Sequence, residues 1–325
     1  MFMKWYTWML ILFLAPATTL IAQQTGLTPL DIARLETVSG VTLSDDGAYA
    51  AYTLRVYPDP REDNAPARSE IHLLDLSAEE TRPFVTRGSA SQVAFRPKHR
   101  SVTILSRLEG DRKTKLYEIP LAGGEAAPIY EFETSISAYE WAPDGQRLVF
   151  IAAEAKKEEA DKEELPYEPE VYEENLSFSR GYVVDLENGE REQIGLSGHL
   201  TGAQWSPDGT LLAVTTAPSP MVDDFFMKRR IAILDAGRLQ TEKASVDHAA
   251  KLGQLAWSPD SRHLAFIAGA HLNDPIDGRL FVVPAAGGKP TNLQPGFEGK
   301  FESIAWADDH TIEFIASKGV WSMMG

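Results

Sequence analysis

Cysteine is absent from the 325 residues of the sequence. A chain without cysteine forms no disulfide framework and has neither a thiolate nucleophile nor a cysteine-ligated metal. Its stability must therefore come from packing.

Basic residues are few relative to acidic ones, and this imbalance narrows the class of partner. There are 31 lysines and arginines against 47 aspartates and glutamates, for a formal net charge of −16. Such a surface repels phosphate backbones and anionic lipid head groups, so we expect no nucleic acid and no membrane as a partner of the mature chain.

Metal-binding motifs are also missing. The seven histidines include no His-x-x-x-His pair, and no Asp-x-Asp-x-Asp-Gly loop occurs. Zinc and calcium sites are typically built from such patterns. We therefore predict no metal site and no cofactor.

The one segment typical of a targeting signal lies at the N-terminus. Lys4 is followed by an apolar run, Trp5–Leu14, and then by Pro16 and small or polar residues that end at Ala22. The run is shorter than the roughly 20 residues that span a bilayer. A basic residue, an apolar run and then small or polar residues, in this order, are typical of a secretory signal peptide. We predict that residues 1–22 are a signal peptide and that the mature protein is exported, to the periplasm or beyond. An uncleaved anchor is the alternative.

An internal repeat sets the predicted architecture. A short apolar strand, a tight polar turn and a second apolar strand recur six times, at residues 41–47, 93–99, 139–145, 203–209, 255–261 and 304–310. Measured between the residues that end the first strand, the steps are 52, 46, 64, 52 and 49 residues. A period of about 40 to 50 residues is typical of a four-stranded propeller blade.

Each copy is followed by further strand patterns. Third strands such as Lys115–Ile119 and Ile231–Asp235 are rich in apolar and β-branched residues, and fourth strands follow Gly-containing turns such as Ala122–Glu125. We therefore predict an all-β fold, a β-propeller of four-stranded blades with six repeats, over residues 41–325. Four tryptophans recur at one position of the repeat, and we expect them to pack between blades: Trp141, Trp205, Trp257 and Trp306.

The two ends of the propeller have their own signals. Residues 23–40 form a lead-in with a short helix, in which Thr28 is the N-cap and Pro29 opens the first turn, and this helix is expected to cover a propeller surface. At the other end, residues 311–316 and 319–322 begin a sixth blade whose outer strand is missing. An open propeller leaves unpaired edges, so we expect an incomplete propeller whose natural product continues beyond Gly325.

Several segments together resemble the N-terminal half of secreted bacterial serine peptidases of the prolyl oligopeptidase family, in the acylaminoacyl-peptidase and dipeptidyl-peptidase-like branch. The resemblance is carried by Leu27–Leu35, by the Trp-Ser-Pro-Asp-Gly repeats, by Pro220–Arg230 and by Asn273–Leu280. It implies an α/β-hydrolase domain downstream, with the serine in a Gly-x-Ser-x-Gly elbow. No such elbow occurs here, and Ser197 and His199 of the nearest string are expected to be loop residues, so no catalytic residue is predicted in this chain.

Long connections between the second and third strands of the blades mark one candidate binding rim, because strand direction alternates within each blade. The acidic insertion at residues 154–179 contains ten carboxylates between Glu154 and Glu174 against three lysines, and its first part is predicted to be a solvated excursion. Its Glu173 and Glu174 resemble the glutamate pair with which dipeptidyl peptidases hold a substrate's amino terminus. A solvated face is the alternative for this pair.

A second rim segment concentrates charge. Asp223, Asp224, Arg229 and Arg230 could pair with one another or contact a hydrolase domain. The resulting hypothesis is that this chain is the propeller portion of an exported serine peptidase that cleaves peptides. This portion gates substrate access and docks the hydrolase domain, and it is not catalytic by itself. The alternatives are a stand-alone periplasmic propeller of the Tol-Pal type that binds proteins, and an enzyme with its site in the central channel.

Overall fold

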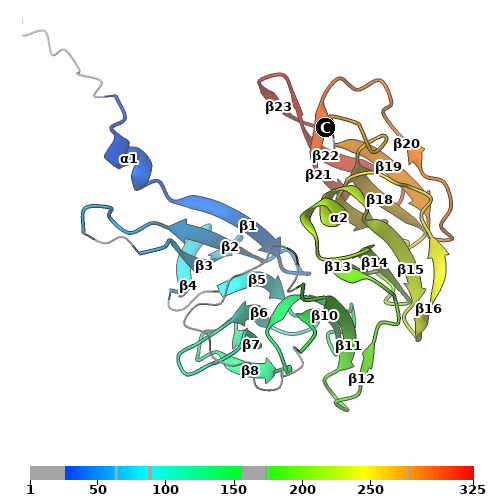
Figure 1. Cartoon of the computed structure of the whole chain (residues 1–325). Helices are drawn as coiled ribbons and strands as arrows, with labels where there is room; N and C mark the ends of the chain where they lie inside the picture. The colour runs from blue at the N-terminus through cyan, green and yellow to red at the C-terminus, as the bar shows by residue number, and fades with distance from the viewer. Residues whose placement is uncertain (1–25, 63–64, 87–89, 156–172, 174–175, 277) are drawn as a thin grey trace, which may run out of the picture.

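The computed structural model contains six antiparallel sheets that follow one another along the chain and are arranged as blades around a central axis (Figure 1). It describes residues 26–62, 65–86, 90–155, 173, 176–276 and 278–325. The predicted signal peptide lies outside the described residues. The all-β propeller predicted from the repeat is confirmed.

The first three blades each have four strands in sequential order. Blade 1 contains β1 (Thr37–Leu43), β2 (Tyr49–Val56), β3 (Arg68–Asp75) and β4 (Glu80–Val85). Blade 2 contains β5 (Ala90–Phe95), β6 (Ser101–Ser106), β7 (Lys115–Pro120) and β8 (Ala127–Tyr130). Blade 3 contains β9 (Ile136–Trp141), β10 (Arg147–Ala153), β11 (Ser179–Asp185) and β12 (Arg191–Gln193).

The last three blades repeat this order, except that the sixth has three described strands. Blade 4 contains β13 (His199–Trp205), β14 (Leu211–Ala217), β15 (Arg230–Asp235) and β16 (Arg238–Ser245). Blade 5 contains β17 (Leu252–Trp257), β18 (His263–Ala268), β19 (Arg279–Pro284) and β20 (Thr291–Asn292). Blade 6 contains β21 (Lys300–Trp306), β22 (Ile312–Lys318) and β23 (Trp321–Met324).

The turn between the first two strands of a blade explains the Ser-x-Asp part of the repeat. In blade 4 the Ser206 hydroxyl donates to Asp208 over 2.6 Å, and the same aspartate accepts the N–H of Thr210 over 3.0 Å. Blades 1 and 5 make the same pair of bonds through Asp46 and Asp260. Short polar side chains that satisfy turn N–H groups favour a tight hairpin over continued strand.

The core is divided into five clusters of buried side chains, each shared by two adjacent blades. Trp141 donates its indole N–H to Thr103 of blade 2 over 2.9 Å, and Trp306 donates to the carbonyl of Ala256 of blade 5 over the same distance. Trp141, Trp205 and Trp257 are buried and Trp306 is half-buried. The predicted packing of the tryptophans between blades is confirmed, and removing one such ring costs about 3–5 kcal/mol.

Blades 1 and 6 stand apart at the two ends of the arc (Figure 1). In blade 6 the first-strand side chains that face blade 5 are buried or half-buried, with Ile304 only 3% exposed. In blade 1 the residue at the same repeat position, Val41, is 65% exposed. The arc is therefore open, with one apolar sheet face uncovered at its start.

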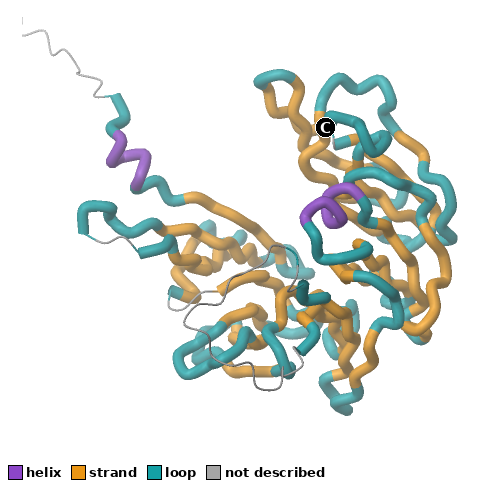
Figure 2. The backbone as a smooth tube through the Cα atoms, viewed as in Figure 1, coloured by secondary structure: helices purple, strands orange, loops and turns teal. Residues whose placement is uncertain are grey.

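Two short helices accompany the strands, α1 (Pro29–Ala33) and α2 (Val222–Met227). Thr28 caps α1 as predicted, in a capping box with Asp31. However, α1 has no buried residue and lies beside the blade 1 loop that follows β2 (Figure 2), so its contacts are with that loop and not with a sheet face. Neither helix of the described part of the chain is long and apolar enough to cross a membrane.

Candidate functional site

The connections between the second and third strands of all blades lie on one face, which we call the loop rim. Its described residues are 57–62, 65–67, 107–114, 154–155, 173, 176–178, 218–229, 269–276, 278 and 319–320. Antiparallel order brings these segments together because each second strand runs toward the rim and each third strand runs away from it. Loops gathered on a rigid scaffold are the usual place for binding residues.

The blade 1 part of the rim is held by an ion-pair cluster. Asp59 accepts from Arg61 over 2.9 Å and is also paired with Arg34, which follows α1. Hydrogen bonds from Arg61 and then Arg34 hold the pKa of the Asp59 carboxyl well below its usual range. A cavity of about 460 Å³ lies between this loop and α1, lined among others by Ile32, Leu35 and Tyr57.

The charged rim segment of blade 4 contains α2, a helix that the sequence analysis did not predict. Asp224, in the first turn of α2, is buried and accepts from Ser219 over 2.6 Å and from Lys228 over 2.7 Å. The bond from Lys228, followed by that from Ser219, lowers the pKa of Asp224. A six-residue helix is too short to form on propensity alone, so these tertiary contacts explain why the sequence did not predict it.

The four charged residues of this segment are not paired with one another. Arg229 donates to the carbonyl of Phe225 over 2.8 Å and contacts the face of the Phe225 ring. Arg230 pairs with Glu242 of β16 over 2.9 Å. Asp223 is exposed. Arg229 also donates to the carbonyl of Leu252 in blade 5. The segment is thus tied to blades 4 and 5, and Asp223 is the member of the four left facing solvent.

Of the predicted glutamate pair in the acidic insertion, the structure describes Glu173. Glu173 is exposed and has a backbone φ of 67°. Glu174 lies outside the described residues. At the two ends of the insertion, Glu154 accepts from Arg180 over 2.6 Å, and His199 accepts the N–H of Ser179 over 2.9 Å. Burial lowers the pKa of the His199 imidazole, which favours its neutral form as an acceptor.

A buried aspartate organises the blade 5 part of the rim. Asp274 accepts the N–H of Ala270 and that of Ile276, each over 2.9 Å, and pairs with Arg279 over 3.4 Å. Burial acts to raise the pKa of Asp274, but these bonds outweigh it and leave the pKa lowered. Asp274 is therefore a structural anchor of this loop and not a proton donor at neutral pH.

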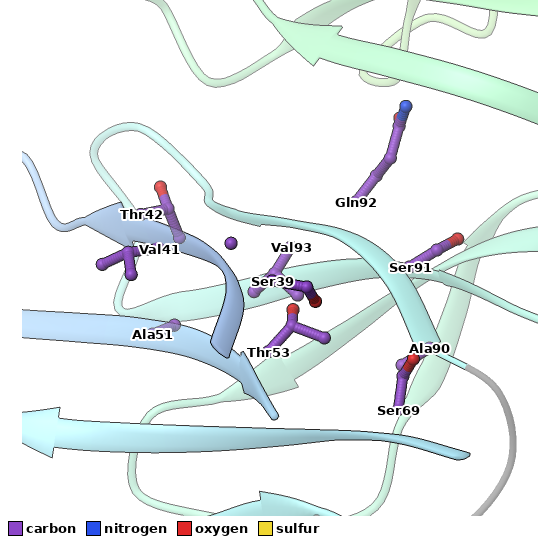
Figure 3. A pocket seen from close by; sticks show the side chains of 11 residues that line it. Ser39, Val41, Thr42, Ala51, Thr53, Ser69, Ala90, Ser91, Gln92 and Val93 are labelled. Atoms are coloured by element: carbon purple, nitrogen blue, oxygen red, sulfur yellow. The ribbon is translucent and has the colours of Figure 1, made fainter. Parts of the chain in front are cut away.

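A pocket that sequence reasoning missed lies between blades 1 and 2. It has a volume of about 360 Å³ and is lined by β1, β2, β3 and β5 (Figure 3). Five of the eleven lining residues carry a hydroxyl, and Gln92 borders the pocket with a left-handed φ of 47°. Its lining residues are Ser39, Gly40, Val41, Thr42, Ala51, Thr53, Ser69, Ala90, Ser91, Gln92 and Val93.

A carboxylate in the first strand of blade 3 is a second feature that the sequence did not single out. Glu140 accepts the backbone N–H of Trp205 in blade 4 over 3.0 Å. Burial raises the pKa of Glu140 to about 8. Among the described residues, no cluster of three or more histidine or acidic side chains could hold a metal ion.

The geometry defines an open, six-bladed propeller with its longest loops on one rim, and solved structures with this fold can now be compared with it. The chain is similar to the Pyrococcus horikoshii acylaminoacyl peptidase, at 13% identity and a TM-score of 0.65, over 91% of this chain and 45% of that one. It is also similar to the β-propeller domain of the Trilobed protease from Pyrococcus furiosus, described as having an open velcro topology, at 12% identity and a TM-score of 0.61 over 89% and 81%.

A putative TolB from Agrobacterium tumefaciens is similar at 15% identity and a TM-score of 0.51, over 79% of this chain and 80% of that one. No family model and no curated protein matches the sequence. The chain spans less than half of the length of the acylaminoacyl peptidase. At these identities the comparisons show the fold, and at that level the predicted resemblance to the propellers of acylaminoacyl peptidases is confirmed.

Proposed function

We propose that this chain is the propeller portion of an exported serine peptidase, in which it docks an α/β-hydrolase domain and filters and orients peptide substrates. One observation carries the proposal: nearly the whole chain superposes on less than half of an acylaminoacyl peptidase. Export rests on the signal pattern of residues 1–22.

The loop rim supports this role. Its segments are anchored by buried or paired groups, such as Asp274 in blade 5 and Asp224 in blade 4. Fixed loops with exposed tips are suited to contact a second domain without rearrangement, because little conformational entropy remains to be lost. The exposed Asp223 and Val222 of α2 provide a mixed charged and apolar contact on this rim.

The proposal is tested with the natural gene product that contains this chain. A fluorophosphonate probe should label that product at a serine outside residues 1–325, and the purified chain alone should remain unlabelled. Deleting residues 156–172 of the acidic insertion should raise turnover of long peptides relative to short ones. Labelling of the chain alone, or a natural product without any reactive serine, would contradict the proposal.

The glutamate pair is tested separately within the same protein. If Glu173 and Glu174 hold a substrate's amino terminus, the double substitution to glutamine should raise KM for peptides with a free amino group. Peptides with an acetylated amino terminus are the control and should be cleaved as before. An equal effect on both substrates would assign the pair to a solvated face.

A stand-alone binding propeller is the second candidate. It is favoured by the match to a putative TolB, of which this chain spans most of the length. In that case the natural gene product would contain no hydrolase domain, and crosslinking in the periplasm would recover a protein partner on the loop rim.

A further inference from the structure

The interface between blades 1 and 2 is filled by smaller side chains than its neighbour. In each of blades 2 to 6, three residues of the first strand face the preceding blade: the one that ends the strand and those two and five positions before it. In blade 3 these are Ile136, Tyr139 and Trp141, and in blade 2 they are Ala90, Val93 and Phe95. The pocket of about 360 Å³ lies where blade 2 has its two small residues.

Blade 1 contributes small side chains on the other side. Thr53 lines the pocket, whereas Leu105 stands at the matching repeat position of blade 2. Ala51 likewise replaces Thr103, and Gly40 replaces Gln92. Both blades thus have smaller side chains at the same place, and this leaves a cavity. In the interface between blades 2 and 3 larger side chains fill the equivalent space.

Tyr139 shows what occupies the equivalent space between blades 2 and 3. Its hydroxyl oxygen lies 2.8 Å from the carbonyl oxygens of both Gln92 and Thr103, which share its one proton. Burial raises the pKa of the Tyr139 phenol above its usual range, as expected for a neutral ring inserted between sheets. The residues that match these two acceptors, Gly40 and Ala51, line the pocket, where Val93 stands in place of the tyrosine.

The pocket also presents polar groups without partners. Within the described residues, no hydrogen bond reaches the hydroxyls of Ser39, Thr42, Thr53 or Ser69. Figure 3 shows the side chains of Ser39, Thr53 and Val93 close together between β1 and β5. None of the lining residues is charged. Thr42, Thr53 and Ser69 are half-buried. Hydroxyls in such positions are usually satisfied, so a neutral polar group entering the pocket gains hydrogen bonds that water supplies less well.

The position of the pocket gives access from the loop rim. Ser69 lies at the start of β3 and Ala90 begins β5, and both strands start at the rim. A chain lying across the rim can therefore place one side chain between the two blades. The volume is in the range of small-ligand pockets and accommodates one aromatic ring.

We infer that the pocket between blades 1 and 2 binds an aromatic side chain of a peptide ligand, with tyrosine preferred. The ring lies against Val93 and Thr53, above the buried Ala51 and Ala90, and the phenol hydroxyl meets the carbonyl edge of β1 and the free serine and threonine hydroxyls. The inference deepens the proposed function, on which it rests only for the choice of a peptide as the ligand. It adds a residue preference set by the propeller.

The experiment is a binding titration of the purified chain with N-acetyl-L-tyrosinamide, followed by NMR of ¹³C-labelled alanine methyl groups. The methyls of Ala51 and Ala90 should shift on titration. N-acetyl-L-phenylalaninamide should bind roughly tenfold more weakly, because it leaves the pocket hydroxyls unpaired. N-acetyl-L-leucinamide should bind more weakly still. Absence of shifts at both alanines, or shifts confined to other alanines, would overturn the inference.

Two substitutions copy residues of the neighbouring interface and close the pocket from opposite sides. Val93→Tyr fills the pocket from blade 2, as Tyr139 fills the equivalent space between blades 2 and 3. Thr53→Leu fills the pocket from blade 1. Each should weaken tyrosinamide binding at least roughly tenfold. Val320→Tyr makes the same change at a site that is 92% exposed and should leave the affinity unchanged.

Equal affinity in both pocket variants and the control would contradict the site. The measurement needs no hydrolase domain. Failure to bind tyrosinamide therefore leaves the docking proposal intact, and a natural product without a reactive serine leaves the pocket result intact.

Discussion

The side-chain carboxyl of Glu140 in blade 3 accepts the backbone N–H of Trp205 in blade 4 over 3.0 Å, and this bond joins the first strands of the two blades. The corresponding link between blades 5 and 6 is made by a neutral amide: Gln254 accepts the N–H of Ile304 and donates to its carbonyl, over 2.9 Å each. A protonated Glu140 resembles that amide because it has both an acceptor and a donor.

The first prediction concerns pH. Burial raises the pKa of Glu140 from 4.5 to about 8, so between these values the folded chain retains a proton that the unfolded chain has released. The contribution of Glu140 to the free energy of unfolding therefore falls as the pH rises from about 4.5 to about 8. Above pH 8 this contribution is constant. Urea unfolding at pH 5, 7 and 9 measures the slope.

Glu140→Gln should remove that slope. A tenfold difference in proton affinity is worth about 1.4 kcal/mol, and this value is reduced because the carboxyl keeps part of its hydration. We therefore expect the free energy of unfolding of the variant to exceed that of the parent by roughly 2 kcal/mol at pH 9 and to equal it at pH 4.5. An identical pH dependence in parent and variant would show that Glu140 is solvated.

Links of this kind could not be predicted from the sequence. The repeat predicted where each first strand ends, because a tryptophan, a phenylalanine or, in blade 1, Leu43 precedes the turn. The partner of a side chain on the next blade depends on how two separate sheets are offset. Gln92 and Gln254 lie three positions before the end of the strand, whereas Glu140 lies one position before it, and nothing local distinguishes these cases.

The pocket between blades 1 and 2 was missed for a related reason. Its signal is the small size of residues such as Ala90 and Thr53, and small residues in a strand suggest no chemistry by themselves. They become informative only when aligned with Ile136 and Leu105 of the neighbouring interface, after the fold is known. By contrast, the capping box of Thr28 and Asp31 is local, and the sequence predicted the Thr28 cap correctly.

The second prediction concerns the glycine of the blade 3 hairpin turn. Gly145 has a φ of 71°, and a Cβ added to it would lie 2.1 Å from the carbonyl oxygen of Pro97 in blade 2. Gly145→Ala should therefore combine backbone strain with a clash between blades and cost about 3 kcal/mol or more in chemical denaturation.

Gly209 in the blade 4 turn provides the matched control. Its φ is 70°, but the nearest atom to an added Cβ lies 3.5 Å away. Gly209→Ala should cost about 1 kcal/mol, from the left-handed backbone alone. Equal losses for the two variants would mean that the turns of blades 2 and 3 do not touch in solution.

The third prediction compares two tryptophans at the same repeat position. The indole N–H of Trp257 donates to the carbonyl of Gln204 over 3.2 Å, whereas that of Trp205 is buried with no partner among the described residues. Substitution by phenylalanine removes similar ring area from both sites, but only Trp257→Phe breaks a hydrogen bond. Trp257→Phe should therefore cost about 1–2 kcal/mol more than Trp205→Phe.

Thermal unfolding of the two variants, with the parent measured in parallel, tests this difference. A cost that is larger at Trp205 would indicate that its indole has an ordered water as partner. Arg147 packs over the Trp205 ring at 5.1 Å, and the phenylalanine retains a ring face for it.

The fourth prediction concerns the uncovered face of blade 1. Val41 and Ile304 occupy the same repeat position, yet Val41 is 65% exposed and Ile304 is 3% exposed. Replacing each by threonine keeps a β-branched side chain in the strand. Ile304→Thr should cost about 2 kcal/mol or more, because it buries an unpaired hydroxyl and removes packing, and Val41→Thr should change stability by less than about 0.5 kcal/mol.

The same pair of variants measures whether this face is covered in a larger assembly. The triad Val38, Val41 and Leu43 matches Phe301, Ile304 and Trp306, which blade 6 packs against blade 5. If a further blade or a partner packs on blade 1 in the natural gene product, Val41→Thr becomes as costly there as Ile304→Thr is in the chain alone. A small cost in both proteins would show that the first blade faces solvent in each.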